Sequence, residues 1–379
     1  MSVKSVCIIG GGISGLVCAQ TLKSLSATRN RALKVTLLEQ SSRLGGQVKT
    51  GSFAVPGTDS RVIVEEGAEG FVTRSTVFPE VARFAGLLED DLVNQQRIAD
   101  CEIQFDSATH SWNIQELEAG VAAQKLGFQV PEKDRGKGIR SFRGGMSQLV
   151  ESIGNNVTYQ TSRSVQSLHA SPTGFELKLG DLEGSSLNAD AVVIATPLTS
   201  MLGILRPLDL EWCTDPLSHH SHVSIHLLFH KGESRLSPRS FTIPQDLQQR
   251  FGGLRACSLV NEKFPGRCQD DHWLFRFYFR PNSTDTVDDA DYWVRLASRA
   301  AQDVFGIRTP VLWSRFSPWS SALPTLTQEH LRDCTAFKEL LLTRFRGRLA
   351  VIGSEVSGAG LEAAATSGYE AALQVIDSA

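Results

Sequence analysis

The chain has 379 residues, of which 41% are hydrophobic and 21% are charged, and its 38 Lys and Arg nearly balance its 41 Asp and Glu. This length favours two domains with large apolar cores, and the composition excludes wholesale disorder. The near-neutral charge offers no basic surface, so no nucleic-acid partner is expected. Seven scattered cysteines have neither metal-binding nor redox spacing, which indicates reduced thiols.

The sequence also bears on where the protein resides. No apolar run approaches the roughly 20 residues that cross a bilayer, and the N-terminus has no secretory signal. We therefore predict a soluble, cytoplasmic protein without a transmembrane segment. Loose attachment to a membrane surface would still be compatible with this sequence. The oligomeric state stays open, and a homodimer is one possibility.

The first elements in chain order predict a βαβ unit. An apolar run at 6–9 ends in Gly10, as a buried parallel strand does, and apolar residues at helical spacing follow over 13–25. A second buried strand is expected at 33–38. This order opens an α/β domain with a parallel sheet.

The remaining elements alternate between sheet and helix. We expect hairpins at 53–55 with 62–64 and at 165–168 with 175–179, and a short alternating stretch at 103–112. Helices are predicted at 77–88, 115–125, 147–153, 290–304 and 361–376, and buried strands at 189–196 and 349–353. Alternating strands dominate 223–279. Because no linker is visible, the two domains are expected to be interleaved.

The turn after the first strand has a phosphate-binding pattern. Gly10, Gly12 and Gly15 form G-x-G-x-x-G, with Ile13 and Ser14 opening the helix. Such glycines allow a tight turn, close approach of a pyrophosphate and close helix–strand packing. The free N–H groups of the helix N-terminus then attract the phosphates. Glu39, at the end of the second strand, is placed to hold a ribose hydroxyl; an exposed strand-end Glu is the alternative.

Two further segments extend this pattern. Arg43, Gly45 and Gly46 complete E-x-x-x-R-x-G-G after Glu39, where the glycines admit a flat ligand and the guanidinium could contact phosphate. A strand near the C-terminus ends in a small-residue loop that opens the last helix, which forms a second amide-rich junction. Plain structural turns are the alternative for both segments. The junction comprises Gly353, Ser354, Gly360, Leu361 and Glu362.

These segments together resemble the flavin-containing amine oxidase superfamily, in which they bind FAD. Gly70–Arg74, the R-G-G-M run at 143–146 and the F-P-G-R turn at 264–267 are similar to the protoporphyrinogen oxidase family in particular. The resemblance implies non-covalent FAD, since 353–362 has no cysteine, with contacts that include Val165. It also implies a Rossmann-like domain at 1–75, 140–200 and 345–379, and a substrate-binding domain at 76–139 and 201–344.

The substrate domain departs from the family it resembles. The stretch between Val93 and Arg143 is short, and the family position of a substrate-pairing arginine falls on Cys101, which cannot supply a guanidinium. Arg97 lies nearby and is either a carboxylate clamp or a solvated side chain. Trp319 could form the wall of a substrate pocket, or it could belong to the core. A substrate smaller than protoporphyrinogen is therefore expected.

Five histidines between His219 and His230 alternate with apolar residues, which predicts a strand rather than a metal site. The polar face with His226 is then either half-exposed or lines a substrate cavity, and no metal is expected. Lacking a second G-x-G-x-x-G, the chain is expected to pass electrons from a small-molecule substrate to O2. The functional hypotheses are a protoporphyrinogen-oxidase-like oxidase, an amine oxidase, and a flavin-free binding protein on the same fold.

Overall fold

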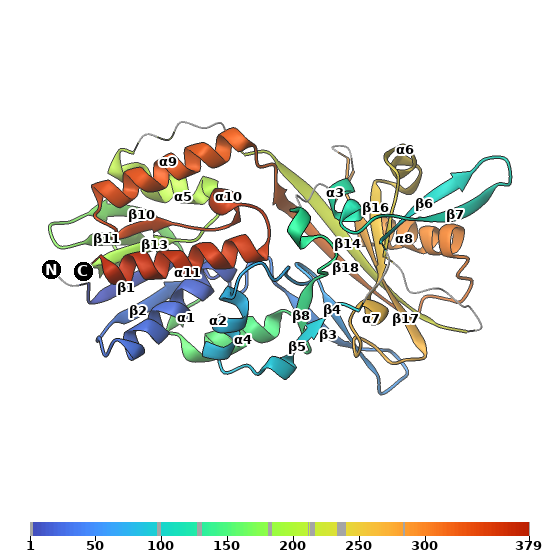
Figure 1. Ribbon diagram of the computed structural model, residues 1–379, viewed down its shortest axis with the longest axis horizontal. Coiled ribbons are helices and arrows are strands. Elements are labelled where there is room, and N and C mark those ends of the chain that lie inside the picture. The colour runs from blue at the N-terminus through green and yellow to red at the C-terminus, as the bar shows by residue number, and fades with distance from the viewer. Residues whose placement is uncertain are drawn as a thin grey trace.

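The computed structural model describes residues 3–96, 100–126, 131–180, 184–210, 212, 217–232, 240–282 and 285–378. Two lobes lie next to each other (Figure 1). One is built on a parallel sheet and carries both ends of the chain, and the other is built on a larger mixed sheet. The predicted α/β architecture, with a Rossmann-like part and a mixed-sheet part, is confirmed.

The parallel sheet gathers strands from distant parts of the chain. Its order is β19-β13-β1-β2-β9, and neighbouring strands are parallel throughout. The strands are β1 (Ser5–Ile9), β2 (Lys34–Leu38), β9 (Tyr159–Gln160), β13 (Ala191–Ile194) and β19 (Leu349–Val351). Because β19 follows a long excursion into the other lobe, the two parts are interleaved along the chain.

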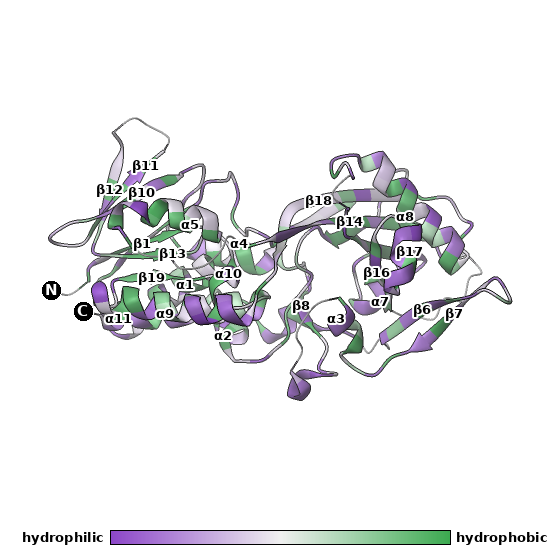
Figure 2. Cartoon of the chain, turned by 90° about the horizontal axis from the view of Figure 1, so that it is seen from above, coloured by the Kyte–Doolittle hydropathy of each residue, from purple (hydrophilic) through white to green (hydrophobic). Residues whose placement is uncertain are grey.

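Both faces of this sheet are covered, which explains its continuously apolar strands. One face packs on α1 (Ile13–Thr28), α2 (Val77–Phe84), α4 (Ser147–Asn156) and α11 (Leu361–Asp377). The other face packs on α5 (Leu198–Leu205), α9 (Gln328–Arg344) and an antiparallel sheet of β10 (Val165–Ala170), β11 (Phe175–Leu179) and β12 (Ser186–Ala189). Figure 2 shows strands rich in hydrophobic residues at the centre of this lobe, with helices around them that carry both hydrophobic and hydrophilic residues.

The second lobe contains a seven-stranded sheet in the order β18-β14-β17-β16-β15-β6-β7. Its strands are β6 (Asp100–Asp106), β7 (Ser111–Glu116), β14 (His219–His230), β15 (Ser240–Thr242), β16 (Leu254–Leu259), β17 (His272–Phe279) and β18 (Trp313–Pro324). The helix α8 (Ala290–Phe305) covers one face through an apolar core that includes Ile225 and Phe275. Alternation along the strands turns His226 and its neighbours to the opposite, polar face.

Shorter elements join the two lobes. A hairpin of β3 (Thr50–Ala54) and β4 (Arg61–Glu65) leads into a segment at 66–70 that touches the polar face of the large sheet. A small sheet pairs β5 (Leu92–Asn94) with β8 (Arg140–Phe142). The remaining helices are α3 (Val121–Lys125), α6 (Gln245–Gln248), α7 (Val260–Lys263) and α10 (Ser354–Ser357), with single 3₁₀ turns at 89–91, 132–134, 206–208 and 249–251.

Two helices are shorter in the structure than the sequence predicts. The helix predicted at 115–125 is wrong over its first half, because Gln115 and Glu116 pair with Glu102 and Cys101 of β6. Only α3 is helical, and it begins after Gly120, which has a left-handed φ of 86°. The helix predicted at 77–88 ends at Phe84 in α2, since Gly86 has a φ of 88°. Among the described residues, no helix is long and apolar enough to span a membrane.

Candidate active site

The glycine turn between β1 and α1 has the geometry that its spacing predicts. A Cβ on Gly15 would lie 2.0 Å from the Gly10 carbonyl oxygen, and a Cβ on Gly10 would lie 2.5 Å from the Ala195 oxygen. Gly12 is the N-cap of α1, and no side chain caps it. A Cβ on Gly12 would meet no atom within 4 Å, so the amides at the start of α1 adjoin open space. This arrangement suits a pyrophosphate.

Glu39 lies at the carboxyl end of β2, next to this turn. Its Oε2 accepts a hydrogen bond from the Gly11 amide at 2.6 Å, and its Oε1 accepts one from the Ser41 amide at 2.8 Å. The structure therefore brings the predicted ribose-binding acid to the glycine turn. The alternative, in which Glu39 is an exposed residue at a strand end without a role, does not account for its hydrogen bond to the Gly11 amide.

The Arg43 loop packs against the same turn. The Gly45 amide donates to the Gly11 carbonyl at 2.8 Å, and a Cβ on Gly46 would lie 3.2 Å from the Gly12 Cα atom. Both Gly45 and Gly46 have left-handed φ values, of 104° and 56°, which other residues rarely adopt. The Arg43 guanidinium donates to the carbonyls of Leu44, Val48 and Gly46. The sequence motif predicts that the Arg43 guanidinium contacts phosphate. In the structure its hydrogen bonds instead go to backbone carbonyls and hold the loop in place.

The C-terminal junction reaches the start of α1. A Cβ on Gly353 would lie 3.7 Å from the Ser14 hydroxyl oxygen. The helix α11 begins at Leu361 after Gly360, again without a side-chain cap, and a Cβ on Gly360 would meet no atom within 4 Å. Glu362 accepts a hydrogen bond from the Ser75 amide at 3.0 Å, which ties the start of α11 to the segment before α2. Gly353, the N-cap of α10, therefore lies beside the start of α1, and the uncapped start of α11 follows seven residues later, after Gly360.

The glycine turn, the Arg43 loop and the C-terminal junction together form what we call the cradle. The other predicted cofactor residues lie around it. Ser354 opens the short helix α10, directly after Gly353. Val165 begins β10, two residues after Arg163, whose amide donates to the Glu39 carbonyl at 2.8 Å. These positions fit a dinucleotide that runs from Glu39, past the glycine turn, to the C-terminal junction. The donor set is backbone N–H, which suits phosphate and flavin carbonyl oxygens.

A charged cluster, which no sequence motif predicted, lies where the two lobes meet. The Glu66 carboxylate is 3% exposed, and its Oε2 lies 2.8 Å from Arg315 Nη2, 3.1 Å from Lys49 Nζ and 3.3 Å from Ser317 Oγ. Arg276 donates to the Gly67 carbonyl at 2.7 Å from the same sheet face. These contacts lock the segment after β4 onto the polar face of the large sheet.

A cavity of about 240 Å³ adjoins this cluster, lined by Arg43, Lys49, Glu66, Ser317, Pro318 and Trp319. Arg43 comes from the cofactor loop and Trp319 from the large sheet, so the cavity joins the two parts of the predicted site. The Trp319 Nε1 atom donates to the Glu66 carbonyl at 2.7 Å. Of the two interpretations of Trp319, the structure favours the pocket wall, although the indole is fixed by a hydrogen bond.

His226 lies on the same sheet face, in register with Arg276 on one side and Arg315 on the other. It is 0% exposed, so the half-exposed alternative is wrong for this residue. Neither ring nitrogen has a hydrogen-bond partner among the described residues. Burial and the guanidiniums of Arg276 and Arg315 hold the pKa of His226 well below its ordinary value. The imidazole is therefore neutral, with a free donor and a free acceptor.

Cys101 does not join this group. Cys101 is buried on β6 in the apolar core beneath α8, with Ile103 and Phe241. Since His226 faces the other side of the sheet, the structure does not bring the two together. Arg97 lies outside the described residues.

Two buried ion pairs support the segment between the lobes. Glu69 Oε2 lies 2.5 Å from Lys263 Nζ, and although burial alone would raise the pKa of Glu69, Lys263 and Arg276 lower it. Glu65 Oε1 lies 3.5 Å from Arg267 Nη2. Burial raises the pKa of Glu65 to about 7, despite Arg267 and hydrogen bonds from Thr50 and the Met146 amide. Two consecutive acids at a strand end, Glu65 and Glu66, are the only sequence feature that could have pointed to this cluster.

Comparison with known sequence families gives two matches. Residues 8–86 match an NAD(P)-binding Rossmann-like domain, and residues 79–376 match the flavin-containing amine oxidoreductase family. A coproporphyrinogen III oxidase from Bacillus subtilis (strain 168) is 36% identical over 91 residues, which are 24% of this chain and 18% of that protein. Polyamine oxidase 5 from Oryza sativa subsp. japonica is 50% identical over 56 residues, 14% of this chain and 10% of that protein. These matches span less than a fifth of either relative.

Solved structures share the fold over nearly the whole chain. A candidate protoporphyrinogen oxidase from Exiguobacterium sp. 255-15 superimposes with a TM-score of 0.76 at 16% identity, covering 99% of both chains. Cyclohexylamine oxidase from Brevibacterium oxydans IH-35A gives 0.69 at 13% identity, covering 100% of this chain and 99% of that one. With the family match over residues 79–376, this chain belongs to the flavin-containing amine oxidoreductase family.

Proposed function

We propose that the protein binds one FAD non-covalently and oxidises a small organic substrate by removing hydride from a C–H bond next to nitrogen or within a ring. The observation that carries the proposal is the cavity between Arg43 and Trp319. It adjoins both the dinucleotide cradle and the polar face of the second sheet. A bound flavin supplies the two-electron chemistry, and the chain supplies binding, orientation and electrostatics.

The cradle residues have distinct parts in this proposal. The uncapped N-terminus of α1 at Gly12 holds the pyrophosphate, and Glu39 holds the adenosine ribose. The uncapped N-terminus of α11 at Gly360 directs its amides toward the flavin ring. Amide donors there would stabilise negative charge on a reduced flavin. No cysteine lies in 353–362, which supports non-covalent attachment.

In the proposed substrate cavity, Trp319 forms one wall, and Glu66 with its partners Lys49 and Ser317 lines another part. His226 and its flanking arginines lie on the same sheet face as Ser317 and Trp319. His226 is fully buried and does not line the cavity, so its neutral imidazole is proposed to influence the substrate only through Arg276 and Arg315 beside it. A substrate smaller than protoporphyrinogen is proposed, because the segment between Val93 and Arg143 is short. O2 is the proposed electron acceptor, which yields H2O2.

Amine oxidation with release of an imine or aldehyde is the second candidate. The short match to polyamine oxidase 5 and the fold shared with cyclohexylamine oxidase favour it. The matches to coproporphyrinogen III oxidases favour the porphyrinogen-like reaction on a ring. A flavin-free binding protein on this fold would not need the two uncapped junctions.

The test is a peroxide and oxygen-consumption assay on purified protein reconstituted with FAD, using coproporphyrinogen III, protoporphyrinogen IX and a panel of primary and cyclic amines. Turnover of amines alone assigns the second candidate. Turnover of coproporphyrinogen III or protoporphyrinogen IX would contradict the proposed smaller substrate and would assign a porphyrinogen instead. Failure to bind FAD at all removes both oxidase proposals and leaves the flavin-free one.

A further inference from the structure

A second cluster of polar side chains lies far from the cradle, at the other end of the large sheet. His230 is the last residue of β14 and His272 is the first residue of β17, and the two pair directly across the ladder. The opposite end of β14 begins at His219, whose Nε2 lies 3.0 Å from Glu355 Oε1 beside the C-terminal junction. The full length of the strand therefore separates His230 from the cofactor side.

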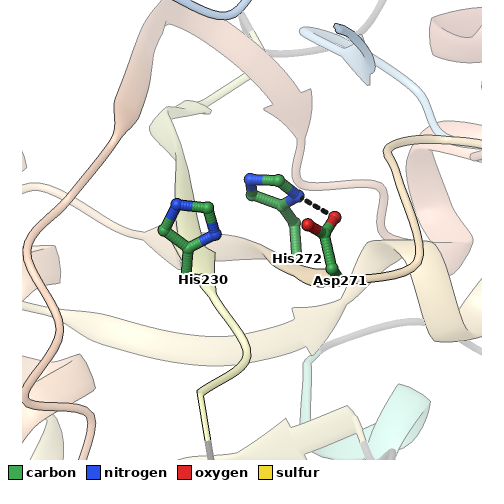
Figure 3. A group of neighbouring side chains, drawn as sticks. All are labelled: His230, Asp271 and His272. Atoms are coloured by element: carbon green, nitrogen blue, oxygen red, sulfur yellow. Dashed lines mark hydrogen bonds and ion pairs between the residues drawn. The ribbon is translucent and has the colours of Figure 1, made fainter. Parts of the chain in front are cut away.

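His272 lies between two potential partners (Figure 3). Its Nδ1 is 2.5 Å from Asp271 Oδ1, and its ring centroid is 4.5 Å from that of His230 on the other side. One ligand atom from each of the three side chains lies within 4.8 Å of one from each of the others. His230 and Asp271 are exposed, whereas His272 is only 3% exposed.

The buried imidazole of His272 is incompletely satisfied. Asp271 holds its Nδ1, but its Nε2 has no hydrogen-bond partner among the described residues. A buried nitrogen without a partner costs about 1–3 kcal/mol. Figure 3 places His230 on the side of His272 away from Asp271, next to this nitrogen. A cation at that point supplies the missing partner.

The local charge also favours a cation. Lys231 Nζ is paired with Glu262 Oε1 at 3.1 Å and lies 4.4 Å from the centre of the Trp273 ring. The exposed carboxylates of Asp270 and Asp271 then leave an excess of negative charge at this edge.

We propose that His230, Asp271 and His272 bind one divalent first-row transition-metal ion of the Zn²⁺ or Cu²⁺ class. Imidazole nitrogen is a preferred ligand of both ions. His272 and His230 ligate the ion, and Asp271 keeps its hydrogen bond to His272, which fixes the tautomer as an outer carboxylate does in many zinc sites. Water completes the coordination. This departs from the sequence-based expectation that the chain has no metal site.

The required movement is small. Ligand atoms around a tetrahedral zinc ion lie roughly 3.4 Å apart, given bonds of about 2.0–2.1 Å. A ligand atom of His230 already lies within 4.8 Å of one of His272. Because His230 is exposed, rotation of its side chain closes the gap, while the buried His272 and its hydrogen bond to Asp271 stay in place.

Untagged protein treated with a chelator and then dialysed tests the proposal by equilibrium dialysis and calorimetry with Zn²⁺. We expect one tightly bound ion per chain. His230→Ala, which removes an exposed side chain and leaves the fold intact, is expected to weaken binding at least about tenfold, and Asp271→Asn about 10–100-fold. His272→Asn is expected to abolish binding, with its fold checked by circular dichroism.

Two exposed positions supply matched controls. Asp270→Asn changes the neighbouring carboxylate, and His110→Ala removes a histidine from the turn between β6 and β7. Both variants are expected to bind Zn²⁺ as the unaltered protein does. Absence of Zn²⁺ binding by the unaltered protein, or equal binding by His230→Ala, would overturn the proposal. Neither result depends on flavin binding or turnover, so the proposed oxidase function is tested separately.

Discussion

Gly353 lies beside Ser14, so close that a Cβ on Gly353 would stand 3.7 Å from the Ser14 hydroxyl oxygen. The two residues belong to strand-to-helix junctions near opposite ends of the chain. Gly12 caps α1 and Gly353 caps the short helix α10, and no side chain caps the N-terminal amides of either helix. Their proximity is the structural basis for a single cradle that holds a dinucleotide.

The packing of α1 on α11 depends on Gly368. A Cβ there would lie 2.2 Å from the Ser14 carbonyl oxygen, so Gly368→Ala forces the helices apart. We expect the free energy of unfolding to fall by about 1–3 kcal/mol or more, as in overpacked cores, with weaker FAD binding. Urea denaturation measures the change. The control is Gly203→Ala on α5, where a Cβ meets no atom within 4 Å; equal stability of the two variants would contradict this packing.

The buried pair of Glu69 and Lys263 predicts a large effect of removing one charge. Glu69→Gln leaves the Lys263 ammonium buried and unpaired, so we expect a loss of about 3–5 kcal/mol in the free energy of unfolding. The same change in the more solvent-exposed pair Glu176–Lys178 is expected to cost much less, because water screens an ion pair at the surface. A small effect of Glu69→Gln in urea denaturation would show that water reaches Lys263.

The pKa directions give this pair a pH dependence. The pKa of Glu69 is lowered, so its stabilising effect is complete above the ordinary Glu pKa of about 4.3 and is lost as the pH falls through the lowered value. The stability difference between the unaltered protein and Glu69→Gln should therefore narrow in acid. A difference that stays constant down to acid unfolding would contradict the ion pair.

His226 predicts opposite effects on stability and on turnover. Because neither ring nitrogen has a partner among the described residues, His226→Leu removes an unsatisfied buried group, and we expect the apoprotein to gain about 1 kcal/mol. If the imidazole acts on the substrate through Arg276 and Arg315, kcat/KM falls at least about tenfold. Leu228→Met, two residues along the same strand face, is the control for both measurements. Lower apoprotein stability with normal turnover would place His226 in a purely structural role.

His222 predicts a loss of stability in mild acid. Burial and Arg276 lower the pKa of His222 to about 3, whereas an unfolded histidine titrates near 6.5. The unfolded state therefore binds the proton first, and the folded state loses about 2 kcal/mol between about pH 7 and pH 5. His222→Gln should flatten this part of the stability profile in chemical denaturation. An unchanged slope would mean that the folded imidazole is protonated in this range.

The cradle was predictable because its signals are local. Gly10, Gly12 and Gly15 follow a strand and open a helix, and each glycine has a steric reason within a few residues. Glu39 and the Arg43 loop follow at short range. Predictions from such short spacings need no knowledge of the tertiary fold. The structure places the predicted residues around the glycine turn.

The contact between the lobes was not predictable in the same way. Glu66, Lys49 and Arg315 come from three distant segments, and only the pairing of β14 with β17 and β18 brings them together. Alternation in the sequence could not decide whether the polar face of β14 is buried, since such a face can meet either solvent or a buried interior. Likewise, Gln115 and Glu116 carry a helix-compatible sequence, but pairing with β6 holds them in a strand.

The most direct test of the central claim is FAD titration of the unaltered apoprotein and of Gly12→Ala. Gly12 has a φ of −71°, and a Cβ there meets no atom within 4 Å, so the variant should fold normally. The added methyl group would occupy the space needed by the pyrophosphate. We predict one FAD per chain, released intact on denaturation, and affinity at least about tenfold weaker for Gly12→Ala. Equal affinity in the two proteins, or no FAD binding by either, would contradict the cradle.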